Sequence, residues 1–356
     1  MPFHPSRRAA IGRLAALPGA LSALLAGMPA PAAAQAATSA VTAAPAKAAA
    51  GPRPIFVLNS LDASVSVIDP VSFTETRRIP TGKEPHHLYL TPDEKSLLVA
   101  NALSNSLTFI DPSTAEVQRV LNDIVDPYQL RFSPDMKWFV TAANRLDHVD
   151  LYHWKPQDAA QPLKLIKRIA APKTPSHLTI DSRSSTVYVS LQDSNELMAI
   201  DLATLAPRWK IPSGKMPADV FLTRDDKRLF VGLTGDRFVE VYDVSGATPQ
   251  LLQRIATGEG AHAFRARGDG RHLFVSNRVA NTISMIDTQA MAVVAELPGP
   301  SGPDCMEVLA DGKTLLVSSR WARKLSFIDI DSRKLLRQVP VGKSPHGVWT
   351  LDHAPR

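Results

Sequence analysis

The chain has 356 residues, 44% of them hydrophobic, and carries a formal net charge of +6 at pH 7. This hydrophobic content is enough for a sizeable buried core and excludes a chain that is disordered throughout. A single cysteine, Cys305, excludes an intramolecular disulfide.

The first 36 residues have the composition of an export signal. A basic start with three arginines precedes an apolar run from Leu14 to Met28, and small residues follow up to Ala36. The run is short for a membrane span and is interrupted by Pro18. The pair Arg7-Arg8 resembles a twin-arginine signal, although alanine stands two residues after it, where an aromatic residue or leucine is common. We therefore expect export, cleavage near Ala36, a periplasmic location and no transmembrane segment in the mature protein.

Residues 37–53 are rich in Ala, Pro, Thr and Ser without periodic apolar positions, which indicates a flexible leader. Removing residues 1–36 deletes three arginines and no acid, which leaves 37 basic and 34 acidic residues and a formal charge of +3. So small an excess is too mild to imply a nucleic-acid partner.

An apolar residue followed by aspartate recurs through the rest of the chain. These aspartates are Asp69, Asp111, Asp201, Asp243, Asp287 and Asp329, with Asp150 as a degenerate seventh. Consecutive clear members are 42 to 44 residues apart, and the 90 residues between Asp111 and Asp201 fit two repeats plus an insertion at His153 to Pro162. A second marker runs in phase: Pro85, Pro127, Pro175, Pro217, Gly260, Pro303 and Pro345. Self-similarity at this period indicates seven copies of one structural unit.

Each marker is followed by an apolar strand and by a turn such as Thr91 to Lys95. A second strand rich in Val, Leu and Phe comes next, for example Ser96 to Asn101, and a third strand ends at the aspartate. We expect the aspartate, which recurs once per unit, to cap a turn. A fourth, more polar strand such as Val117 to Leu121 completes the unit. Four short strands in about 42 residues are typical of a propeller blade.

The two ends of the repeat region complement each other. It begins with strands two to four of a unit, Ile55 to Ile79, and ends with a lone first strand, Gly347 to Leu351. We therefore predict an all-β fold, a seven-bladed β-propeller over residues 54–351 closed by pairing the N-terminal strands with the C-terminal strand. Residues 352–356 form a tail.

Three units resemble the YVTN family of bacterial β-propeller repeats: "LLVANALSNSLTFIDPSTAEV", "LFVSNRVANTISMIDTQAMAV" and "LLVSSRWARKLSFIDIDSRKL". The resemblance covers nearly all of residues 54–351 and implies the propeller fold. Such propellers include binding proteins, surface-layer modules and relatives of the haem domain of nitrite reductases, so the resemblance does not select one function.

In a propeller, the loops that enter the first strands open around the central channel, which is the default ligand site. The second residues after the markers are His87, Gln129, His177, Asp219, His262, Cys305 and Gly347, and the preceding positions include His86, Tyr128, Ser176, Asp304 and His346. Three of the second residues are histidines from the first, third and fifth units, counted from Pro85. His87, His177 and His262 therefore suit one zinc or copper ion, with Asp219 or Cys305 as a further ligand. The alternative is a polar channel lined for solvation alone.

Loops between the second and third strands reach the same rim. Arg145, Arg278 and Arg320 take equivalent places there, and Trp321 adds a flat apolar surface. With Tyr128, Gln129 and His346, these residues suit an anionic or aromatic ligand or a partner protein. Solvated surface arginines are the alternative. No local signature supports Cys305 as a nucleophile.

The sequence therefore predicts a monomeric periplasmic propeller with a binding or scaffolding role toward a small molecule, a metal ion or another protein. It favours a non-enzyme without deciding the question. A metal- or haem-dependent oxidoreductase or cofactor carrier is the alternative, and a surface-exposed adhesion module is a third reading.

Overall fold

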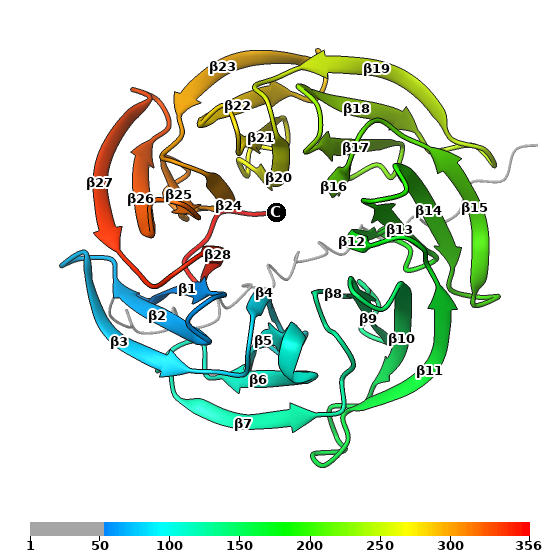
Figure 1. Ribbon diagram of the computed structural model, residues 1–356, viewed down its shortest axis with the longest axis horizontal. Helices are drawn as coiled ribbons and strands as arrows, with labels where there is room; N and C mark the ends of the chain where they lie inside the picture. Colours follow the sequence, from blue (N-terminus) through cyan, green and yellow to red (C-terminus); the bar gives the residue numbers. More distant parts are fainter. Residues whose placement is uncertain (1–52) are drawn as a thin grey trace, which may run out of the picture. The chain divides into compact units, whose positions relative to one another are not determined.

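The structure, a computed structural model, describes residues 53–356. The predicted export signal, and all of the leader except Arg53, lie outside the described residues. The described part contains twenty-eight strands in seven four-stranded antiparallel sheets, arranged as blades around a central channel (Figure 1). This confirms the predicted all-β, seven-bladed propeller. Within the same residues, no helix is long and apolar enough to cross a membrane.

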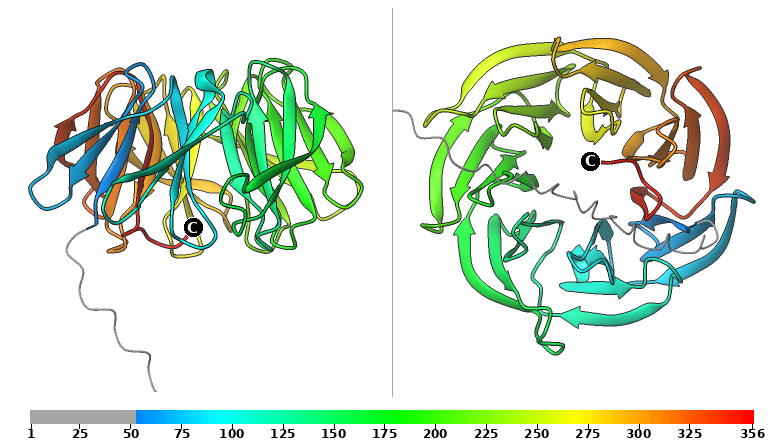
Figure 2. Two further views of the ribbon diagram at one scale, coloured as in Figure 1. Left: turned by 90° about the horizontal axis from the view of Figure 1, so that it is seen from below. Right: turned by 180° about the vertical axis from the view of Figure 1, so that it is seen from behind.

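Every blade has the same order of strands from the channel outward, which can be followed from both sides of the ring (Figure 2). The innermost strands of blades one to seven are β4 (Pro85–Leu90), β8 (Gln129–Phe132), β12 (Pro175–Ile180), β16 (Pro217–Leu222), β20 (Ala261–Ala266), β24 (Pro303–Val308) and β28 (Pro345–Thr350). The second strands are β5 (Leu97–Asn101), β9 (Trp138–Ala143), β13 (Thr186–Leu191), β17 (Arg228–Leu233), β21 (His272–Asn277), β25 (Thr314–Ser319) and β1 (Ile55–Asn59).

The third strands are β6 (Ser106–Ile110), β10 (His148–Trp154), β14 (Glu196–Asp201), β18 (Phe238–Asp243), β22 (Thr282–Asp287), β26 (Lys324–Asp329) and β2 (Ser64–Asp69). The outermost strands are β7 (Val117–Asn122), β11 (Leu163–Ala170), β15 (Ala206–Pro212), β19 (Gln250–Ala256), β23 (Ala292–Pro298), β27 (Lys334–Pro340) and β3 (Thr74–Pro80). One 3-10 turn, η1 (Ala102–Ser104), follows β5. The loop before β11 spans residues 155–162, within the stretch predicted to hold the insertion, and His153 belongs to β10.

The hydrophobic core lies between neighbouring blades. The cluster at the closure contains Phe56 and Leu58 from β1, Leu97 and Val99 from β5, and Trp349 from β28. Second strands are almost entirely buried, whereas the outermost strands are mostly exposed. The Val, Leu and Phe residues of the second strands therefore supply the apolar area that each blade buries against the next.

Strand β28 pairs antiparallel with β1, so the two ends of the propeller share the seventh blade. Phe56 and Trp349 are register partners, and their ring centroids are 6.2 Å apart. Both side chains are at most 1% exposed. The predicted closure is consistent with this pairing, and noncovalent packing holds it.

Six of the recurring aspartates cap turns, as predicted. The Asp69 carboxylate accepts hydrogen bonds from the backbone N–H groups of Val71 and Ser72, at 2.7 and 2.9 Å. Asp111 and Asp201 make the same pair of contacts in their own blades. A carboxylate that bonds the backbone two and three residues ahead fixes a turn. The seventh member was assigned wrongly, because Asp150 lies within β10, is fully buried and pairs with Arg168.

The register of the fifth blade differs from the sequence prediction by one residue. Ala261, rather than Gly260, pairs with Asn277 in the place where Pro85 pairs with Asn101. Gly260 instead has a φ of +82°. The residue before the marker position, which is Ala261 in blade five, has a positive φ in every blade: Glu84, Asp126, Thr174, Met216, Gly260, Gly302 and Ser344. Glycine adopts this conformation most easily, so the fifth blade has its glycine one place before the true marker.

Candidate functional site

Two successive residues of each first strand stand at the channel. With the corrected register, the first residues after the markers are His86, Tyr128, Ser176, Ala218, His262, Asp304 and His346. The second residues are His87, Gln129, His177, Asp219, Ala263, Cys305 and Gly347. Six of the seven first strands have a register shift here, and a bulge of this kind re-aims side chains.

Five imidazoles meet at the centre of the ring. The ring centroid of His86 lies 3.8 Å from that of His346, and His87 lies 4.9 Å from both His346 and His177. His262 follows at 5.5 Å from His177. All but His87 are at most 4% exposed. We call these five residues the histidine cluster, and it fills the channel between the inner strands.

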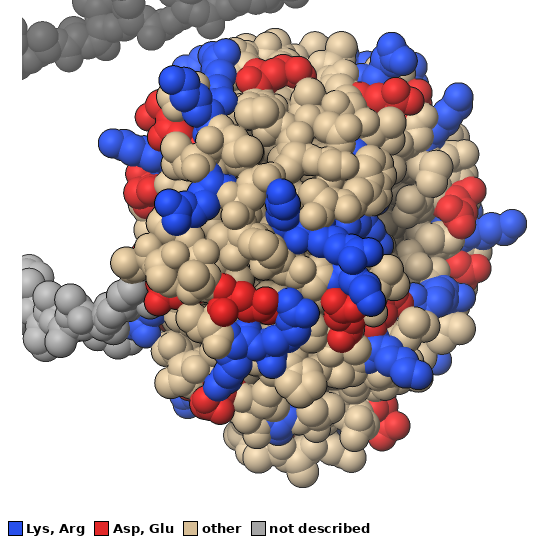
Figure 3. Space-filling model, turned by 60° about the vertical axis from the view of Figure 1, so that its left-hand side comes forward, with Lys and Arg blue, Asp and Glu red and all other residues tan. Residues whose placement is uncertain are grey.

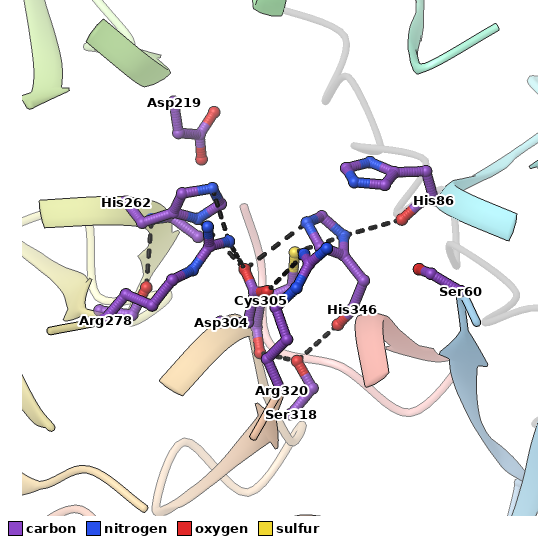
Figure 4. Close-up of polar contacts among 12 residues, drawn as sticks. Ser60, His86, Asp219, His262, Arg278, Asp304, Cys305, Ser318, Arg320 and His346 are labelled. Carbon is purple, nitrogen blue, oxygen red and sulfur yellow. Dashed lines mark hydrogen bonds and ion pairs between the residues drawn. The ribbon is translucent and has the colours of Figure 1, made fainter. Parts of the chain in front are cut away.

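Asp304 of β24 is the anion at this cluster and is fully buried. Its carboxylate accepts a hydrogen bond of 2.6 Å from Arg278 and one of 3.3 Å from Arg320 (Figure 4). The Asp304 Oδ1 atom also lies 3.2 Å from His262 Nδ1 and 3.5 Å from His346 Nε2. Burial alone would raise the pKa of Asp304, but the Arg278 guanidinium and the two histidines hold it well below its ordinary value. Asp304 is therefore ionised at neutral pH.

Arg278 and Arg320 separate this buried carboxylate from solvent. Their side chains are 18% and 27% exposed, and both belong to loops that follow second strands. Arg278 also donates a 2.8 Å hydrogen bond to His262 Nε2, because a guanidinium has no acceptor. Two cations thus face one anion, which leaves an excess positive charge at the mouth of the channel.

The histidines add no further charge at neutral pH. Burial, followed by neighbouring histidines and arginines, lowers the pKa of His86, His177, His262 and His346. The same causes lower the pKa of His87 to about 3. The cluster is therefore made of neutral imidazoles, each with one N–H group and one lone pair.

The predicted metal set does not meet at one point. Among the described residues, the groups of three with ligand atoms within 4.8 Å of one another are His86, His87 and His346, and His262, Asp304 and His346. Of the predicted set, only His87 and His262 belong to these groups. His177, Asp219 and Cys305 belong to neither. The corrected register places His262 in the same ring as Asp304 and His346.

His87, Gln129, His177, Asp219 and Cys305 instead line a cavity of about 90 Å³ on the other side of the cluster. Such a volume has room for about three waters, so solvation alone explains this polar lining. Burial raises the pKa of the Cys305 thiol well above its usual value. The thiol therefore stays protonated and is a poor nucleophile.

The C-terminal tail closes this end of the channel. Arg265 and Glu307 form a buried ion pair there, and Arg265 donates hydrogen bonds to the carbonyls of Ala354 and Pro355, at 2.7 and 3.2 Å. Arg356 also pairs with Glu307 and reaches the 90 Å³ cavity. The end of the chain lies near the centre of the ring in both face views (Figures 1 and 2). Residues 352–356 are therefore packed against blades five and six.

The rim arginines do not act as one group. Arg278 and Arg320 directly follow β21 and β25, whereas Asn144 holds that place after β9 and Arg145 lies one residue further. The Arg145 guanidinium pairs with Glu84 at 2.7 Å and with Asp126, so its charge is already compensated. The predicted equivalence of the three arginines is therefore wrong for Arg145, and only the other two converge on Asp304.

Trp321 remains on the rim beside Arg320. Its side chain is 55% exposed, and its indole packs over Gly302, where an added Cβ would lie 2.7 Å from the ring. Tyr128 lies deeper, with its ring centroid 3.8 Å from that of His86. The rim thus offers one aromatic surface next to the paired guanidinium groups.

Charge elsewhere on the surface is mixed. The face drawn in Figure 3 interleaves Lys and Arg with Asp and Glu rather than presenting one sign of charge. A separate cavity of about 310 Å³ lies between blades four and five, and Phe221, Arg224, Arg228 and Arg271 are among its lining residues. The Arg228 guanidinium there donates to the Thr288 carbonyl and Arg271 pairs with Asp287.

A sequence model of the YNCE-like beta-propeller family matches residues 8–356. This match supports the predicted bacterial propeller family, while the YVTN repeat label stays a prediction. No curated protein matches the sequence at a significant level.

Among solved structures, a functionally unknown protein from Desulfotomaculum acetoxidans superposes with a TM-score of 0.72, at 16% identity, over 85% of this chain and 99% of that one. The periplasmic gluconolactonase PpgL of Pseudomonas aeruginosa gives 0.70, at 18% identity, over 83% and 98%. The dihydro-heme d1 dehydrogenase NirN gives 0.62, at 17% identity, over 84% and 75%. At these identities the likeness concerns the fold alone.

Proposed function

The chain belongs to the YNCE-like beta-propeller family, and from this premise we propose that it is an exported, periplasmic binding protein. Its ligand is a small anion, held at the channel mouth by Arg278 and Arg320. The observation that supports this function most strongly is the buried carboxylate of Asp304, which holds two partly exposed guanidinium groups over neutral imidazoles.

The charge balance of this arrangement favours an anion. One carboxylate cannot neutralise two guanidinium groups, and the histidines, whose pKa values are lowered, are neutral at pH 7 and leave this excess of one positive charge unchanged. Partial burial of the two arginines strengthens their attraction for an incoming anion, because the effective dielectric constant is lower there than in water. The site is therefore preorganised for a negative group.

The donor geometry favours a carboxylate ligand. A guanidinium group is planar and offers paired N–H donors that match the two oxygens of a carboxylate. Of the donor nitrogens of Arg320, only Nη1 has a hydrogen-bond partner within residues 53–356. The other donors of this guanidinium group therefore face no competing acceptor. Trp321 next to it offers an apolar surface for the body of the ligand.

The alternative function, a metal- or haem-dependent oxidoreductase or cofactor carrier, has less support for its haem form. The histidine cluster fills the channel between the inner strands, and the cavity beside it has a volume of about 90 Å³. Pockets for drug-sized ligands are several times larger. Haem therefore does not fit inside the channel.

Binding is tested by titrating the protein calorimetrically with malonate, D-gluconate and phosphate, each against chloride at constant ionic strength. D-gluconate is included because a gluconolactonase shares the fold. We expect saturable binding of at least one carboxylate. Replacing Arg320 by Gln should weaken that binding about tenfold or more, since a charge-assisted hydrogen bond contributes roughly 1.5–3 kcal/mol.

The matched control is Arg237→Gln, which removes an exposed arginine from the β17–β18 loop. It should leave the affinity unchanged. Absence of saturable binding by all three anions, or equal losses in the two variants, would overturn the proposed function.

A further inference from the structure

We propose that His262, Asp304 and His346 form a binding site for a single transition-metal ion of the zinc or copper class, and that Arg278 occupies the place of the cation when no ion is bound. This goes beyond anion binding at the mouth, because it concerns the face of Asp304 that points into the histidine cluster.

The spacing of the donor atoms suits one ion. His262 Nδ1 lies 3.2 Å from Asp304 Oδ1, and His346 Nε2 lies 3.5 Å from the same oxygen. Two ligand atoms that are each about 2.1 Å from a metal lie about 3.0 Å apart at a right angle and about 3.4 Å apart at the tetrahedral angle. The three atoms all lie within 4.8 Å of one another. An ion therefore fits between them with small side-chain adjustments.

His346 has a lone pair that faces a negative charge. Its Nδ1 atom lies 2.8 Å from the carbonyl oxygen of His86, which only accepts, so Nδ1 carries the hydrogen. In a neutral imidazole Nε2 then holds the lone pair, and Nε2 is the atom next to the Asp304 carboxylate. His346 Nε2 has no hydrogen-bond partner among the described residues, although the His346 side chain is fully buried. A cation beside Asp304 would give this lone pair a partner.

The second group of three, His86, His87 and His346, is less suitable. It contains no carboxylate, so nothing in it offsets the charge of a buried ion. Asp304 provides that charge in the first group.

Arg278 is the competitor of the ion. It donates to both Asp304 Oδ1 and His262 Nε2, so the hydrogen of neutral His262 lies on Nδ1. Coordination by Nδ1 requires Arg278 to release Nε2, to which the hydrogen then moves, and the imidazole stays neutral throughout. Removing the guanidinium should therefore favour the metal, because it removes both a like charge and a competing contact.

The test is a Zn²⁺ titration of chelator-treated, full-length mature protein, followed by calorimetry and, with Co²⁺, by absorption in the visible range. We expect one equivalent of metal per chain. Arg278→Gln should bind Zn²⁺ about tenfold or more tightly than the unsubstituted protein. His346→Gln should lose the site, and His153→Gln, which replaces a partly buried histidine of β10 outside the histidine cluster, should keep it.

Circular dichroism of each variant shows whether it is folded. If His346→Gln is unfolded, the Arg278→Gln comparison still decides, because only a metal in this position gains from losing that charge. Equal Zn²⁺ affinity in Arg278→Gln and the unsubstituted protein, or no stoichiometric binding in either, would overturn the proposal. The same variant should bind carboxylates more weakly, so failure of the metal site is distinguishable from failure of the anion site.

Discussion

Lowering the pH from 7.5 to 5 is expected to destabilise the propeller by several kcal/mol. His86, His177, His262 and His346 are buried as neutral imidazoles, and their pKa values in the folded protein lie below the ordinary value of about 6.5. Below pH 6.5 the unfolded chain therefore binds more protons than the folded one. Stability is complete above that pH and falls by up to about 1.4 kcal/mol per pH unit for each of the four histidines.

Carboxylates near the cluster modify this trend. The lowered pKa of Asp304 adds stability that is present above about pH 3.8 and is lost as the pH falls further, so it acts in the same direction. Burial raises the pKa of Asp219, so acidification relieves the cost of its buried charge and opposes the trend. One carboxylate does not cancel four histidines.

The measurement is chemical denaturation of the mature protein at pH 7.5, 6 and 5. His177→Gln should reduce the slope of unfolding free energy against pH by about one proton, or about 1.4 kcal/mol per unit. Arg278 and Arg320 stay charged throughout and should not affect the slope directly. Equal stability at pH 7.5 and 5 would show that the imidazoles are accessible to protons in the folded state.

Replacing Trp349 by Ala is expected to lower the unfolding free energy by about 3–5 kcal/mol, the usual cost of truncating a fully buried aromatic side chain. Trp349 is 1% exposed and packs on Phe56 across the β28–β1 pairing that closes the ring. The loss should therefore be concentrated at the closure, and the amides of β1 and β28 should exchange faster than those of blades three and four.

The matched control is Trp321→Ala, because this tryptophan is 55% exposed on the rim. It should change stability by less than about 1 kcal/mol. Denaturant unfolding followed by hydrogen exchange separates the two outcomes. If both substitutions cost the same, or if exchange increases uniformly around the ring, the seventh blade is not the point at which the propeller closes.

The fold could be predicted from the sequence because its signal recurs. Seven markers in phase, with an aspartate cap in six of the units, constrain every blade at once, so an error in one unit leaves the others intact. Trp349 illustrates the same advantage, since a lone first strand at the end of the chain has meaning only when the other blades are counted. Local periodicity in any single unit would not have established the closure.

The site was harder to predict because it depends on single residues rather than on a repeat. In blade five, Gly260 occupies the left-handed position that Glu84 or Ser344 holds in other blades. The sequence prediction took Gly260 as the marker, and it therefore counted His262 among the second residues after the markers instead of the first. In blade two, Arg145 lies one residue further from the end of the second strand than Arg278 and Arg320 do in their blades. The sequence placed Asp304 at the channel without giving it a role, and nothing in the pattern indicated that two arginines from different blades would meet its carboxylate.

A crystal structure of the protein with bound malonate or D-gluconate tests the proposed anion site most directly. The account expects the ligand carboxylate within hydrogen-bond distance of both Arg278 and Arg320, on the solvent side of Asp304. A carboxylate found only in the cavity lined by Arg224 and Arg228 between blades four and five, with Arg278 and Arg320 uncontacted, would contradict it.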